Sequence, residues 1–186
     1  RPNRSYHAPD GGLPPQTARM DERAVFTDAY AVIPANTMTD IVTSNLPFWD
    51  KTRLWVLARP LSGFAETFSQ YIMDVAPGGG SEKPELDPTA QGVLFVVRGE
   101  MTLTLDGQSH HMEPGGYAYL PPASNWQVRN EGDSNVQFHW VRKQYEAVDG
   151  LPQPDAFVLN ERDIAPIPMP DTEGKWATSR FVEPDD

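Results

Sequence analysis

Histidine is the residue type most able to do chemistry at neutral pH, and this chain has four: His7, His110, His111 and His139. A metal site on a β-strand needs ligands two residues apart, because side chains at i and i+2 share a face. His110 and His111 are adjacent, so on a strand they point to opposite faces and cannot hold one ion. His7 lies in a polar amino-terminal stretch, and His139 has no ligand-forming neighbour. We therefore expect no metal site in this chain.

Other catalytic arrangements are equally weak in the sequence. The chain contains no cysteine, which excludes thiolate nucleophiles, thiolate metal ligands and disulfides. Glu82, Glu85 and Asp87 precede an apolar run and are interpreted as a solvated loop. The glycines at 78–80 lack the following Lys-Ser/Thr of a phosphate loop and predict a turn. No Gly-x-Ser-x-Gly nucleophile elbow occurs.

Aromatic side chains are the more informative set, because many of them fall on segments that read as strands. They either line a pocket for a small planar ligand or fill the interior, and the second interpretation is favoured. If a pocket remains, its candidate residues are Gln91, Phe95, Trp126 and His139. The aromatic set consists of Phe95, Tyr117, Tyr119, Trp126, Phe138 and Trp140.

The segments that would position these residues are short strands separated by Gly- and Pro-rich turns, the pattern of an all-β sandwich or barrel. Residues 93–97 (VLFVV) form a continuous apolar run, which predicts a strand buried on both faces. Asp106-Gly107 predicts a two-residue hairpin turn. The other expected strands are 24–33, 53–58, 67–75, 101–105, 117–120, 126–129 and 136–142.

The chain divides into three parts that differ in polarity, proline content and periodicity. Residues 1–22 are polar and predict an amino-terminal arm, and residues 23–145 hold the expected barrel. Residues 146–186 are proline-rich with little periodicity, which favours a linker that leads to a second barrel absent from this chain. Trp176 and Phe181 are apolar enough that part of this linker is expected to dock.

The composition of the chain argues against two classes of binding partner, nucleic acid and membranes. The net charge is −11 over 186 residues, and an acidic chain repels nucleic acid and anionic membranes. No apolar run reaches the ~18–20 residues of a membrane span. The sequence thus predicts a cytoplasmic protein without nucleic-acid or membrane partners.

Residues 77–99 and 107–130 (GQSHHMEPGGYAYLPPASNWQVRN) have the rhythm of the two motifs of the cupin family. The resemblance implies a double-stranded β-helix, or jelly-roll barrel, whose motifs usually supply a His-x-His, a Glu and a second His to one metal. Here Gln91 and Gly92 flank the slot of the Glu, and Trp126 stands in the slot of the last His. An indole there would plug the pocket.

A more specific resemblance rests on LFVVRGEMTLTLDG, GGYAYLPP and VRKQYEAVDG. These runs resemble the amino-terminal half of the (S)-ureidoglycine aminohydrolases, also called glyoxylate-induced proteins. The resemblance implies two tandem cupins in a homo-oligomer that converts (S)-ureidoglycine to (S)-ureidoglycolate and ammonia in allantoin catabolism. It places manganese in the second cupin only, so this chain would hold no cofactor.

Three interpretations remain open from the sequence. The first is the non-catalytic half of such an enzyme, with a structural and oligomerising role. The second is a metal-free cupin that binds a small molecule in its aromatic barrel. The third is a metal-independent isomerase with His139 as base, for which the sequence identifies no acid partner.

Overall fold

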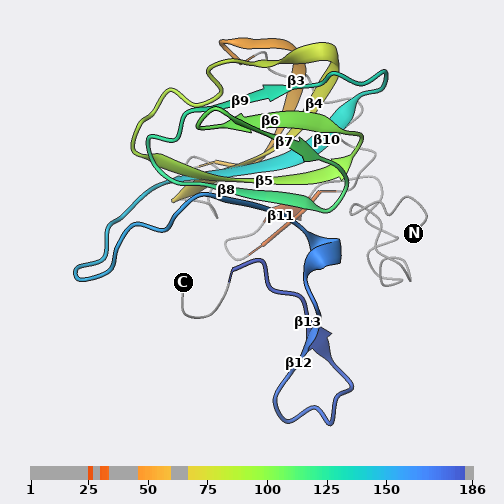
Figure 1. Ribbon diagram of the computed structural model, residues 1–186, viewed down its shortest axis with the longest axis vertical. Helices are drawn as coiled ribbons and strands as arrows, with labels where there is room; N and C mark the ends of the chain where they lie inside the picture. Colours follow the sequence, from red (N-terminus) through yellow and green to blue (C-terminus); the bar gives the residue numbers. More distant parts are fainter. Residues whose placement is uncertain (1–24, 27–29, 34–45, 60–66, 183–186) are drawn as a thin grey trace.

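The computed structural model describes residues 25–26, 30–33, 46–59 and 67–182, and almost all of them lie in strands or short connections (Figure 1). A 3-10 helix, η2 (Glu161–Asp163), follows the eleventh strand. The strands are β1 (Val25–Phe26), β2 (Ala31–Val32), β3 (Trp49–Ala58), β4 (Phe68–Ser81), β5 (Ala90–Arg98), β6 (Met101–Leu105), β7 (Gln108–Met112), β8 (Gly116–Leu120), β9 (Trp126–Arg129), β10 (Val136–Gln144), β11 (Phe157–Asn160), β12 (Ile167–Pro168) and β13 (Ala177–Thr178).

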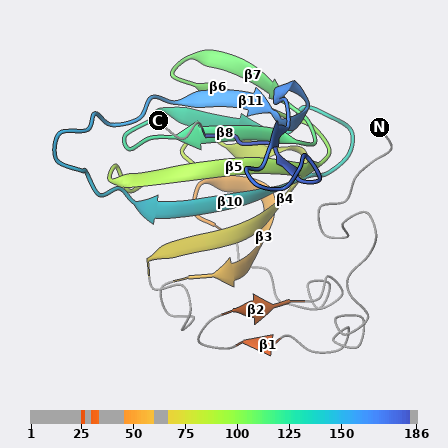
Figure 2. The same cartoon turned by 90° about the horizontal axis from the view of Figure 1, so that it is seen from below.

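A single nine-stranded antiparallel sheet wraps around the core. Its order is β11-β8-β5-β10-β4-β9-β6-β7, and β3 pairs with β4 beside this path. Figure 2 shows β11, β8, β5, β10 and β3 in succession, and Figure 1 shows β9 and β6 above β5, β8 and β11. The expected all-β barrel is therefore confirmed.

The fourth strand joins the two sides of the barrel. β10 pairs with its first part and β9 pairs with Gly80 and Ser81, while β3 pairs with both parts. The bend falls at Gly78 and Gly80, whose φ angles are +70° and +138°. The predicted turn at these glycines is wrong, because the chain stays extended here and uses the glycines to change partners.

Side chains that point into the barrel alternate along each strand with side chains that point outward, and the inward ones form the core. Leu94, Val96, Leu103 and Phe138 are completely buried, together with residues of β4, β8 and β9. Val93 and Phe95, on the opposite face of β5, are only half-buried. The continuous apolar run therefore does not mark a strand equally buried on both faces; its outward side chains have a lighter cover.

The turn between β6 and β7 has the geometry that the sequence predicts, whereas the first predicted strand is divided in two. Asp106 and Gly107 have φ angles of +48° and +84°, and Leu105 lies opposite Gln108, so the two-residue turn is confirmed. The segment expected as one strand at 24–33 contains two short strands, β1 and β2, that pair with each other. The amino-terminal arm at 1–22 lies outside the described residues.

One strand of the barrel sheet lies within residues 146–186, the segment predicted to be a linker. This strand, β11, pairs with β8 from Phe157↔Tyr119 to Asn160↔Gly116 and extends the sheet beyond residue 145.

Among the described residues, no helix is long and apolar enough to cross a bilayer.

Candidate functional site

A cavity of about 300 Å³ opens at one end of the barrel, where the loops before β5 and before β9 meet. The first loop spans residues 82–89 and the second spans residues 121–125. Both loops belong to the stretches with the two-motif rhythm, so the cavity occupies the position in which that rhythm predicts a metal. Its lining includes Glu85, Leu86, Asp87, Gln91, Gly92, Ser124, Asn125, Trp126 and Trp140.

Two indoles form the inner end of the cavity. Trp126 is 5% exposed and meets Trp140 edge to face, with 5.7 Å between ring centroids and 79° between planes. Trp140 also packs against Trp49 at 5.9 Å and against Tyr71 at 5.6 Å. Aromatic pairs in these geometries stabilise a core beyond the area they bury. The barrel interior below the cavity is therefore filled with rings.

Gly92 packs closely against Trp140. A Cβ added at Gly92 would lie 3.2 Å from Nε1 of Trp140, a tight contact that the indole would have to relieve by a small shift. The glycine and the tryptophans are thus mutually dependent features of the same site.

The acidic loop beside the cavity is more ordered than the sequence suggests. Glu85 receives two hydrogen bonds from Arg142, from Nε at 2.6 Å and from Nη2 at 2.7 Å. The Glu85 side chain is only 14% exposed, so the solvated-loop interpretation is wrong for this residue. The Arg142 guanidinium also lies 5.8 Å from the Trp140 ring centroid, within cation–π range.

Three further polar side chains of the cavity form hydrogen bonds within the chain. Asp87 accepts hydrogen bonds from the hydroxyl and the backbone amide of Thr89, which lower the pKa of its exposed carboxyl. Gln91 accepts a hydrogen bond from the Tyr119 hydroxyl at 3.0 Å. The Ser124 hydroxyl donates to the carbonyl of Pro121.

This set of donors does not fit a transition-metal ion. Such sites draw on several imidazoles or carboxylates that converge on one point. The cavity has no imidazole, and its better-placed carboxylate is neutralised by Arg142. Across the part of the chain that the structure describes, no three His, Cys, Asp or Glu side chains gather closely enough to hold an ion.

The four candidate pocket residues divide between two places. Gln91 and Trp126 both line the cavity. Phe95 and His139 are cross-strand partners on the outer face of β5 and β10, away from the buried side chains of those strands. Nδ1 of His139 lies 3.3 Å from Nε2 of Gln70. The base of the isomerase interpretation therefore lies outside the cavity.

A second aromatic group covers the outer face of β5 and β8. Phe181 stacks on Tyr117 at 4.6 Å between ring centroids and meets Phe95 edge to face at 5.9 Å. Phe157 of β11 contacts Tyr117 and Tyr119 at 5.8 and 5.7 Å. Burial raises the pKa of Tyr117 and of Tyr119. The apolar character of Phe157 signalled this contact, which the sequence reasoning missed.

Known protein families and relatives match the part of the chain that forms the barrel and its cavity. The EutQ-like cupin domain family matches residues 62–145, which include both loops of the cavity. The barrel has the cupin fold. The sequence is 24% identical over 110 residues to the (S)-ureidoglycine aminohydrolase of Escherichia coli K12, a match that covers 59% of this chain and 41% of that enzyme.

Two solved structures extend this cupin comparison. A protein of Pseudomonas aeruginosa described as a glyoxylate-induced protein is 61% identical, with a TM-score of 0.83, over 98% of this chain and 66% of that one. The E. coli protein Ylba shares the fold at 22% identity and a TM-score of 0.72, over 82% of this chain and 61% of that one. The cupin chain therefore spans less than two thirds of each of these relatives.

Proposed function

We propose that this chain is the non-catalytic amino-terminal cupin of a manganese-dependent (S)-ureidoglycine aminohydrolase. The reaction replaces the amine of (S)-ureidoglycine with the hydroxyl of water, giving (S)-ureidoglycolate and ammonia. In this proposal the chain supports a second, metal-holding cupin and helps to build a homo-oligomer. The work would belong to the cytoplasmic breakdown of purines through allantoin.

One observation carries the proposal: the cavity at the cupin motif position contains indoles and internally paired polar groups where a catalytic cupin needs free metal ligands. Trp126 and Trp140 fill the inner end, and Glu85 is held by Arg142. The 61% identity to a glyoxylate-induced protein and the 24% identity to an aminohydrolase supply the reaction class. A chain of this family with such a cavity needs its chemistry elsewhere in the protein.

The test compares the full gene product with residues 1–186 alone. Both are purified, analysed for bound manganese, and assayed for ammonia release from (S)-ureidoglycine. We expect metal and turnover in the full product and neither in the shorter chain. Turnover by residues 1–186, or a full product without a second cupin, would refute the proposal.

The open cavity favours a second candidate, a metal-free cupin that binds a small planar molecule against Trp126 and Trp140. A ligand that binds only the folded state raises the melting temperature, by mass action. A thermal-shift screen with purine catabolites and sugars tests this on the 186-residue chain. The candidate requires a shift that is abolished by Trp126→Ala but not by a change at Phe95, which lies outside the cavity.

A further inference from the structure

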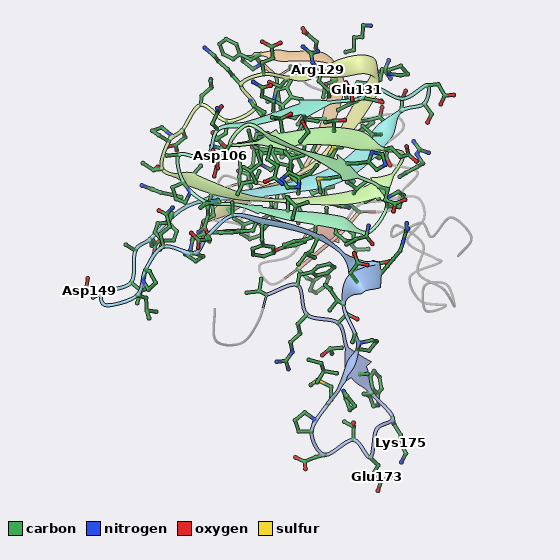
Figure 3. The ribbon with its side chains drawn as sticks, viewed as in Figure 1. Asp106, Arg129, Glu131, Asp149, Glu173 and Lys175 are labelled. Atoms are coloured by element: carbon green, nitrogen blue, oxygen red, sulfur yellow. The ribbon has the colours of Figure 1, made fainter. Side chains whose placement is uncertain are left out.

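An arm formed by residues 164–180 projects from the barrel (Figure 1). Its strands β12 and β13 pair through Ile167↔Thr178 and Pro168↔Ala177. The amide of Met169 donates to the carbonyl of Trp176 at 2.8 Å and continues the hairpin. Glu173 and Lys175 lie at the far end of the arm and form an ion pair of 2.8 Å (Figure 3).

The arm is fixed to the barrel at both ends, so its direction is set by the fold. At the start, β11 pairs with β8, and Arg162 forms a 2.7 Å ion pair with Glu113. At the end, Phe181 returns to the barrel and stacks on Tyr117. The hairpin is therefore a protrusion that leaves and re-enters one face of the barrel.

Apolar side chains of the arm are exposed. Trp176 is 72% exposed, Ile167 is 48% exposed and Met169 is 36% exposed. Trp49, Trp126 and Trp140, by contrast, are at most 8% exposed. An isolated hairpin with two-residue strands is marginal in water, and hydrophobic patches that project from a surface mark contacts with other protein.

We propose that this arm docks against the second domain of the parent protein, with Trp176 as its buried anchor. The inference rests on the proposed function, which requires such a domain. About a third of the 61%-identical relative lies outside its match to this chain. Phe181 brings the chain back to the outer face of β5 and β8 beside the arm, where it contacts Phe95 and Tyr117.

The arm has no net charge. The arm itself carries Asp171, Glu173, Lys175 and Arg180, two charges of each sign, and so presents a neutral apolar surface. Aromatic anchors set in such a surface are typical centres of protein interfaces.

Acrylamide quenching of tryptophan fluorescence tests the docking. Trp176→Phe is compared with wild type in the 186-residue chain and in the full gene product, so that the difference reports Trp176 alone. We expect Trp176 to be readily quenched in the short chain and at least five-fold less quenched in the full product. In the full product, Trp176→Ala should lower the melting temperature, whereas Leu151→Ala, a 67% exposed leucine off the arm, should leave it unchanged.

The outcomes separate this inference from the proposed function. If the full product contains a second cupin but Trp176 is quenched equally in both proteins, the docking is refuted and the proposed function stands. If Trp176 is protected in the short chain in proportion to its concentration, a second copy is the occupant and the docking is also refuted. A gene product without a second domain refutes both, and its mass shows this independently.

Discussion

Trp126, Trp140 and Gly92 line one side of the cavity and pack together. The indole edge of Trp140 lies against the space that a Gly92 side chain would need, and Trp126 closes the same region from β9. A side chain at position 92 would press against Trp140, while a glycine without the indoles would leave a void. The packed rings therefore stabilise the inner end of the cavity.

Trp126 should contribute far more to stability than Leu86, although both line the cavity. Trp126 is 5% exposed, and its truncation to alanine removes a ring packed on Trp140, so we expect a loss of about 3–5 kcal/mol in the free energy of unfolding. Leu86 is 60% exposed, and Leu86→Ala should cost under about 0.5 kcal/mol. Urea denaturation of both variants measures this, and equal losses would contradict the packing argument.

Glu85 and Glu82 provide a matched pair for the ionic contribution at the cavity. The Glu85–Arg142 pair is bidentate and mostly buried, so Glu85→Gln should lower the free energy of unfolding by about 1.5–3 kcal/mol. Glu82 is 72% exposed and pairs with Arg129 at 3.0 Å, so Glu82→Gln should cost less than about 1 kcal/mol.

The two glutamine variants differ in their salt dependence as well. The Glu82 pair should weaken in 1 M NaCl, whereas the shielded Glu85 pair should persist. A larger loss for Glu82→Gln than for Glu85→Gln would show that burial does not decide the strength of these pairs.

The sequence predicted a pocket position for Trp126 but not the role of Glu85. Motif spacing places Trp126 and Gly92 because the two motifs lie close to each other in the chain and each has fixed landmarks. The partner of Glu85 is Arg142, 57 residues later on β10, and no local pattern links the two. Ion pairs across a barrel depend on strand register, which one sequence does not specify.

At the scale of elements, β4 decides how the barrel closes. It pairs with β3 at both ends, with β10 in its first part and with β9 at its end, and β9 takes the place of β10 where Gly80 passes the backbone of Val128. A side chain at Gly80 would overlap the Val128 carbonyl, and its φ of +138° disfavours any other residue.

Gly80→Ala is therefore expected to disrupt the β4–β9 pairing and to lower the free energy of unfolding by more than about 3 kcal/mol. Gly107→Ala is the control, because Gly107 also has a positive φ but a Cβ added there would have no other atom within 4 Å. That change should cost about 1 kcal/mol. Thermal melting followed by circular dichroism compares the two, and similar melting temperatures would contradict the role of close approach at Gly80.

The outer aromatic group gives the barrel a dependence on alkaline pH. Burial raises the pKa of Tyr117 and Tyr119 above the ordinary value of 10.0, so the folded state holds these phenol protons more tightly than the unfolded state. The resulting stabilisation is complete below pH 10 and is lost as the pH rises through the folded pKa values. The double variant Tyr117→Phe/Tyr119→Phe should show a smaller fall in stability above pH 10, measured by urea denaturation. An unchanged fall would assign the effect to other groups.

The sequence identified most barrel strands but not the strand at 157–160. Residues 101–120 alternate regularly and carry clear turns, so their hairpin could be predicted. The run Phe157-Val158-Leu159-Asn160 is only four residues long, follows a proline-rich stretch, and gains its strand character from pairing with β8. Tertiary pairing, not local propensity, makes this segment extended.

At the scale of the whole molecule, β11 protects an edge that the barrel would otherwise leave open. It pairs along β8, and Phe157 and Phe181 cover the aromatic outer face behind that edge. An unpaired strand edge beside exposed aromatic residues is a template for association with another chain. The carboxy-terminal segment thus contributes to the cupin fold itself as well as carrying the projecting arm.

Truncation after residue 145 should therefore destabilise the barrel and make it self-associate, even though the truncated chain keeps every strand from β1 to β10. Loss of two half-buried rings is expected to cost about 2–4 kcal/mol, and the bared β8 edge should appear as concentration-dependent sedimentation. A chain that ends at residue 163 keeps β11, Phe157 and η2, so it should sediment like the 186-residue chain and lose only the arm and the Phe181 contact. Equal melting temperatures and equal sedimentation of the two truncated chains would show that β11 does not stabilise the barrel.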